Sequence, residues 1–205
     1  MTELPTDKDL LQLPHRAVVA FACRCARRVQ PKYTLWMLSS SPDPRTQQAS
    51  SLEKAIHTAE DFANGIELAE DVYEEMIEDV LDAGNRAGAD SPSYASSAAV
   101  HAAKAAAFAL RSARSAAHYA NPAPHETFPS PDTVAIMAAH AAAAAAQAGS
   151  PTSPMREDYH RLAATCLAPY PELGETIDCH ENGPLGNLWN GEPPHWYRAV
   201  VSPEE

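Results

Sequence analysis

The sequence is poor in the motifs from which many enzyme active sites are built. Only 8 of its 205 residues are glycine, and it contains no glycine-rich phosphate loop, dinucleotide-binding fingerprint or nucleophile elbow. Alternating runs of β-branched and aromatic residues, which indicate strands, are also missing. We therefore expect neither an α/β nucleotide-binding fold nor an all-β fold, and we do not expect an enzyme.

Long runs of large apolar residues are missing as well, and the mean hydropathy is -0.34. We therefore expect no membrane span. The opening stretch MTELPTDKDLLQLP is polar and acidic, so we expect no secretory signal. Four cysteines at irregular spacing do not indicate a disulfide scaffold, and they are Cys23, Cys25, Cys166 and Cys179. We interpret them as reduced, mostly buried thiols of a cytoplasmic protein.

Basic residues are also scarce. The chain has 15 lysines and arginines against 27 aspartates and glutamates, which gives a formal net charge of -12. This balance disfavours nucleic acids and anionic membranes as partners, because both repel a negatively charged surface. It favours a basic protein partner, or solubility alone.

Alanine at helical spacing is abundant. Two stretches, SYASSAAVHAAKAAAFALRSARSAAHYA and DTVAIMAAHAAAAAAQA, combine the best helix former with a side chain that lets helix axes approach closely. We predict an all-α helical bundle with these two alanine-rich helices at its centre. The six predicted helices span about 14–38 with a kink near Pro31, 51–64, 67–83, 92–120, 132–148 and 154–168.

The composition changes after about residue 170. The segment 171–205 is rich in glycine and proline, yet it carries Trp189, Trp196 and Tyr197. Disordered tails seldom hold so many aromatic residues. We predict an all-helical domain over 1–170 and an extended C-terminal strap over 171–205 whose rings dock onto the helices. A partner-binding peptide is the alternative.

Residues 67–83, ELAEDVYEEMIEDVLDA, carry an unusual density of negative charge. From Glu60 to Asp82 there are ten carboxylates and no lysine or arginine. Pairs of apolar and pairs of acidic residues alternate, which gives one buried and one charged stripe on a helix. Like charges four residues apart cost about 0.2–0.5 kcal/mol per pair, so local stability does not explain the charged stripe. The candidate partner-binding residues on it are Glu70, Asp71, Glu74, Glu75, Glu78 and Asp79.

Three explanations of this charged stripe remain open. It could be a solvated face whose repulsion is tolerated. It could be neutralised internally by basic residues of the first helix, which are Arg16, Arg24, Arg27 and Arg28. It could also be a docking surface for a basic protein, since such a surface speeds association and rejects acidic competitors.

Metal chemistry is a weaker hypothesis. Helical bundles hold metals with Glu and Glu-x-x-His groups on inward faces, and the chain has one such group, Glu157 to His160. Histidines on three of the later helices are candidate ligands for one divalent ion, namely His101, His140 and His160. Ordinary packed or surface imidazoles are the simpler interpretation, and we predict no cofactor.

Two stretches carry a resemblance to a known family. RAVVAFACRCARRVQPKYTLW matches a small-residue helix with the pattern Cys-Ala-x-x-Val-x-Pro, and LEKAIHTAEDFANGI matches a Lys-Ala-Ile/Leu-x-x-Ala helix. The matching residues are Cys25, Ala26, Val29, Pro31, Lys54, Ala55, Ile56 and Ala59. Over about residues 14–120 the chain resembles helical immunity proteins of bacterial polymorphic-toxin systems. The resemblance implies a cytoplasmic protein that binds and blocks a toxin of the same cell.

We therefore predict a protein-binding, immunity-like protein that neutralises a toxin or another basic partner through the acidic helix face. The alternatives are a metal-dependent helical-bundle enzyme and a structural or scaffold protein that uses its C-terminal strap. The three hypotheses differ in their sites. The immunity-like protein uses the carboxylates, the enzyme uses the histidines, and the scaffold protein uses residues 171–205.

Overall fold

The computed structural model describes residues 3–39, 45–66, 69–89, 93–120, 130, 132–189 and 191–201. Within these ranges the chain forms eight helices and no strand, which confirms the predicted all-α helical bundle. The helices are α1 (Asp7–Leu10), α2 (His15–Ser39), α3 (Arg45–Ala63), α4 (Glu70–Ala89), α5 (Tyr94–Ala120), α6 (Asp132–Gln147), α7 (Thr152–Thr165) and α8 (His195–Val201). No helix in the described part is both long and apolar enough to cross a membrane.

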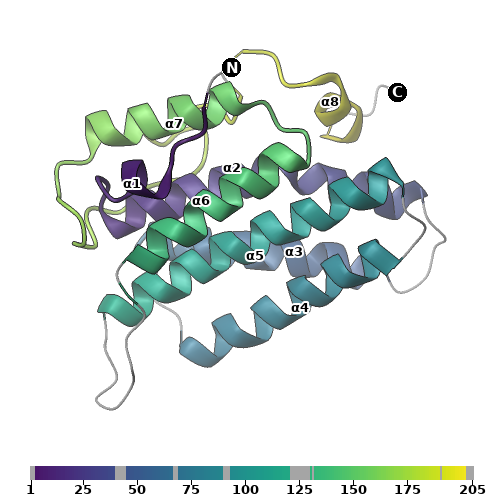
Figure 1. Cartoon of the computed structure of the whole chain (residues 1–205), viewed down its shortest axis with the longest axis horizontal. Coiled ribbons are helices and arrows are strands. Elements are labelled where there is room, and N and C mark those ends of the chain that lie inside the picture. Colours follow the sequence, from purple (N-terminus) through teal and green to yellow (C-terminus); the bar gives the residue numbers. More distant parts are fainter. Residues whose placement is uncertain are drawn as a thin grey trace.

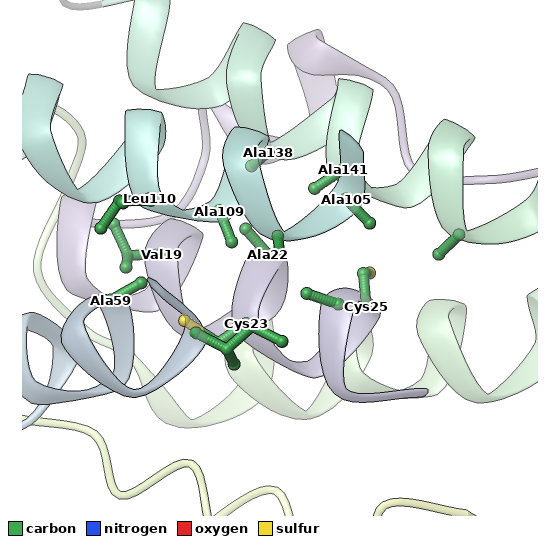
Figure 2. Close-up of a cluster of buried hydrophobic side chains, with 14 of the residues drawn as sticks. Val19, Ala22, Cys23, Cys25, Ala59, Ala105, Ala109, Leu110, Ala138 and Ala141 are labelled. Atoms are coloured by element: carbon green, nitrogen blue, oxygen red, sulfur yellow. The ribbon is translucent and has the colours of Figure 1, made fainter. Parts of the chain in front are cut away.

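Helix α5 lies in the middle of the bundle, where it packs against α2, α3, α4 and α6 (Figure 1). Its buried side chains, and those of α6, are nearly all alanine. Figure 2 shows Ala22, Ala105, Ala109, Ala138 and Ala141 clustered between α2, α5 and α6. Each methyl group stabilises the fold by only about 1 kcal/mol, so stability here depends on many close contacts between helices.

Helix α4 approaches α5 closely at a glycine. The sequence predicted that it ends at residue 83, but it continues through Gly84 to Ala89. Gly84 faces α5, and a Cβ atom at this position would lie 3.2 Å from the Cβ atom of Ala103. The glycine therefore brings α4 close to α5 instead of ending the helix, and this contact is invisible in the local sequence.

Two short helices were not predicted, and one of them alters the expected C-terminal strap. From residue 171 the chain runs without regular structure as far as Pro194 in the described ranges, and then forms α8. We call the described residues 171–189 and 191–201 the strap. It is attached to the start of α2 by hydrogen bonds from the amides of His15 and Arg16 to the carbonyls of Glu172 and Leu173. Because it ends in helix α8, the strap is not extended throughout.

Aromatic rings of the strap pack against one another and against α2. The ring centroid of Trp189 lies 5.2 Å from that of Tyr197 and 6.2 Å from that of Trp196. From α2, Lys32 places its ammonium group 3.9 Å from the centroid of the Trp196 ring. Such cation–π contacts stabilise by about 0.5–1 kcal/mol where they are exposed, and by more where they are desolvated.

Candidate functional site

The amphipathic pattern of α4 fixes the direction of its charged side chains. Its apolar stripe faces the bundle and buries Tyr73, Ile77 and Val80 among other residues. The opposite side carries the six predicted partner-binding carboxylates, and all six are exposed. We call these residues, Glu70, Asp71, Glu74, Glu75, Glu78 and Asp79, the acidic face.

Part of the acidic face is neutralised from α5. The Arg114 guanidinium lies 3.0 Å from Glu70 Oε1 and 2.5 Å from Glu74 Oε1. His118, one turn further along α5, places Nδ1 3.7 Å from Glu70 Oε2. The pairing is at the surface, since Glu74 remains 60% exposed, so we expect each bridge to stabilise by less than about 1 kcal/mol.

The rest of the acidic face has no counter-ion within the chain as described. Glu75, Glu78 and Asp79 form no ion pair or hydrogen bond with a described side chain, and Asp71 accepts a hydrogen bond only from the adjacent Val72 amide. Asp71, Glu75 and Asp79 follow one another at intervals of four residues, and no described cation offsets their mutual repulsion. The result is a charged stripe that is open to solvent.

The arginines of α2 do not neutralise the acidic face, so this alternative was wrong. Arg16 donates a hydrogen bond to the Gly174 carbonyl, and Arg27 pairs with Glu60 at 2.6 Å and Glu53 at 2.8 Å. Arg24 and Arg28 both pair with Asp158 of α7. The neutralising side chain comes instead from α5, where Arg114 lies within an alanine-rich stretch.

Arg24, Arg28 and Asp158 form a second charged group, which we call the guanidinium cluster. Asp158 Oδ2, on α7, lies 2.6 Å from Arg28 Nη2 and 3.3 Å from Arg24 Nε. Arg28 and Asp158 have no exposed side-chain surface, and Arg24 has 2%. One carboxylate therefore serves two buried cations, an arrangement that is stable only if other acceptors complete it.

The strap supplies those acceptors. Arg24 donates to the carbonyls of Gly186 at 2.8 Å and Asn187 at 2.6 Å, and Arg28 donates to that of Leu188 at 3.0 Å. A planar guanidinium offers five donors in fixed directions and can thus bind several carbonyls of a non-helical segment at once. The cluster fastens the strap across α2 and α7. Nothing in the local sequence distinguishes Asp158 from its exposed neighbours.

A cavity of about 470 Å³ lies between α2, α3 and the strap. Its walls include Arg27 and Glu60 on the helices and Cys179, Trp189 and Tyr197 on the strap. The two arginines that line it are paired: Arg27 binds Glu60, which also lines the cavity, and Arg24 binds Asp158 of α7. One thiol-bearing residue, Cys179, also lines the cavity.

The candidate metal ligands are not brought together. His101 lies on α5, His140 on α6 beside Phe108, and His160 on α7 beside Tyr159. In the described chain no group of three or more His, Cys, Asp or Glu side chains could hold a metal ion. Burial and the nearby Lys104 ammonium lower the pKa of His101, which suits a packed neutral imidazole. The geometry gives the metal hypothesis no support.

Comparisons of the chain with family models, with curated proteins and with solved structures find no match.

Proposed function

We propose that this is a binding protein whose acidic face docks onto a basic protein partner. One observation carries the proposal: α4 exposes Glu75, Glu78 and Asp79 with no counter-ion among the described residues. The carboxylates that the fold buries are paired, Glu60 with Arg27 and Asp158 with Arg28. A charged stripe left unneutralised in such a molecule is suited to electrostatic steering of a cationic partner.

The partner we propose is a toxin, which the protein neutralises in the cytoplasm of the cell that makes it. This finer proposal rests on the resemblance of residues 14–120 to helical immunity proteins and on the sign of the charge. Many protein toxins that attack nucleic acids are basic, and a docked acidic face would compete with a polyanionic substrate for their basic surface.

The experiment is a capture comparison among three immobilised forms of the protein. The reversed-face variant combines three substitutions, Glu75→Lys, Glu78→Lys and Asp79→Lys. The control variant reverses three exposed carboxylates outside α4, through Glu172→Lys, Glu175→Lys and Glu192→Lys. Both variants change the net charge equally, so a difference between them reports position and not total charge.

Each form is incubated with lysate of the native host at about 0.15 M and at about 1 M salt, where the Debye length is about 8 Å and about 3 Å. We expect the unaltered protein and the control variant to retain the same basic protein at the lower salt. The reversed-face variant should lose it, and high salt should release it. Equal capture by the reversed-face and unaltered proteins would overturn the proposal.

A further inference from the structure

Two of the four cysteines face each other across the contact between α2 and the strap. Cys23 lies in the middle of α2 and is fully buried, and Cys179 lies in the strap and is 5% exposed. The Cys179 thiol is a side-chain neighbour of the Cys23 thiol, and it donates a hydrogen bond to the Ile177 carbonyl at 3.8 Å. Cys25 leaves α2 in a different direction, as Figure 2 shows, and its charged neighbours are Arg28 and Asp158. Neither Cys25 nor Cys166 has a thiol among its titratable neighbours, so Cys23 and Cys179 are the pair placed to react with each other.

The backbone around Cys179 is held in place on both sides. Two residues earlier, the Ile177 amide donates to the Ala63 carbonyl at 2.8 Å. The Cys179 carbonyl itself accepts from Arg24 at 3.4 Å, and Arg24 directly follows Cys23 in α2. The two neighbouring sulfur atoms must then approach each other to reach the S–S bond length of about 2.05 Å. The fold thus preorganises the pair.

Access to the two thiols is unequal. Cys179 lines the cavity between α2, α3 and the strap, whereas Cys23 has no exposed surface. Burial, together with the neighbouring Cys179 thiol, raises the pKa of Cys23 well above its usual value. An external reagent therefore meets Cys179 first, and Cys23 can act only after Cys179 has been modified.

We propose that Cys23 and Cys179 are a disulfide-forming pair that fastens the strap to α2 when a low-molecular-weight disulfide enters the cavity. The Cys179 thiolate attacks one sulfur of the reagent and releases the other as a thiolate, which leaves a mixed disulfide on Cys179. Cys23 then attacks the Cys179 sulfur, and its proton passes to the second reagent thiolate as that group leaves, so that it departs as a thiol. Two protein thiols are oxidised, and the reagent disulfide is reduced to two thiols.

The new bond would have a structural consequence that does not depend on the acidic face. It would add a covalent link to a contact that the guanidinium cluster maintains by charge and hydrogen bonds alone. A cross-link between residues 23 and 179 closes a long loop, which restricts the unfolded chain strongly. The strap would then stay on α2 under conditions that otherwise release it.

The test treats the folded full-length chain with oxidised glutathione and maps its cysteines by mass spectrometry after alkylation without reduction. We expect free thiols to fall from four to two, a cross-linked peptide pair containing Cys23 and Cys179, and a melting temperature raised by about 5 °C or more. A reductant should reverse all three changes. The pairing of any other two cysteines, or four thiols left free, would overturn the proposal.

Variants distinguish the pair from general thiol reactivity. In Cys23→Ala, Cys179 should stop at the mixed disulfide with glutathione. In the double variant Cys25→Ser and Cys166→Ser, the cross-link should form as in the unaltered protein. If Cys23→Ala folds poorly, Cys179→Ser serves instead, and it should show no cross-link and no glutathione on Cys23. A stable mixed disulfide on Cys179 in the unaltered protein would contradict the second step.

Discussion

The alanine-packed helices and the strap are held together by opposite means. Between α2, α5 and α6, the contacts are made by many small side chains, none of which contributes much alone. Across α2 and α7, the strap is held by three charged side chains that bind each other and a row of carbonyls. The first contact is distributed and apolar, whereas the second is concentrated and ionic.

This contrast implies different responses to substitution. A distributed alanine interface should tolerate loss of a methyl group but not addition of volume, because the helix axes are already close. A concentrated ionic contact should fail when one member is removed, because the remaining charges are left buried without a partner.

The largest effect is expected at Asp158. Asp158→Asn removes the one carboxylate that serves Arg24 and Arg28, so we expect a loss of about 3–5 kcal/mol in the free energy of unfolding. The matched control is Glu157→Gln, which removes an exposed carboxylate paired with Arg161 and should cost less than about 1 kcal/mol. Urea unfolding measures both. Equal losses would show that buried charge does not hold the strap.

Acid should weaken the other end of the strap contact through His15. This ring is buried between Tyr119 at 5.4 Å and Tyr170 at 5.1 Å, and burial lowers its pKa to about 4. In the unfolded chain the pKa is about 6.5, so between these values the unfolded chain binds more protons and stability falls as pH falls. At pH 5 the protonation of His15 should lower the free energy of unfolding by about 2 kcal/mol relative to neutral pH.

The variant His15→Gln separates this titration from that of the carboxylates. Its urea midpoint should fall less than that of the unaltered protein between pH 7 and pH 5. Parallel curves for the two proteins would mean that His15 is protonated equally in the folded and unfolded states.

Added volume tests the alanine interface. Ala138→Leu places three more carbon atoms between α6 and its neighbours, where Ala138 has no exposed surface, so we expect a loss of about 1–3 kcal/mol. The control, Ala164→Leu, makes the same change on the exposed side of α7 and should be nearly neutral. If thermal unfolding showed no difference between them, the helices would not be as closely packed as the structure has them.

A smaller contrast separates two glycines of α4. Replacing glycine by alanine within a helix stabilises by about 1 kcal/mol when nothing obstructs the methyl group. Gly88→Ala meets only Val100 Cγ2 at 3.4 Å and should be stabilising, whereas Gly84→Ala meets Ala103 Cβ at 3.2 Å and should lose that gain. If the two variants had the same urea midpoint, the close approach of α4 to α5 would not explain why Gly84 is a glycine.

The alanine-packed helices could be predicted from the sequence, and the guanidinium cluster that holds the strap could not. Helical periodicity and alanine content predict α5 and α6 because each residue contributes to the pattern, so no single one is decisive. The acidic face was predictable for the same reason. The guanidinium cluster depends on Asp158, which meets Arg24 from a helix more than a hundred residues away. A contact of this kind has no local signature.

Errors at helix ends have a similar origin. Gly84 looks like a helix stop when only its neighbours in sequence are considered, but it is required by Ala103 on another helix. The sequence pointed to the arginines of α2 as counter-ions of the acidic face because they are more numerous, whereas the residue that pairs with Glu74 is Arg114 of α5. Tertiary packing decides which charged side chains pair with each other, and this cannot be predicted from composition.

The central claim is that the acidic face is not required by the fold, and the urea stability of the reversed-face variant tests it most directly. Glu75→Lys lies four residues from Asp71, and Glu78→Lys lies four residues from both Glu74 and Asp82, so three like-charge pairs become opposite-charge pairs, while positions 75 and 79 remain a like-charge pair. The variant should be as stable as the unaltered protein or more stable by up to about 1 kcal/mol. A loss of more than about 1 kcal/mol would mean that these carboxylates serve the fold itself, and it would contradict the claim.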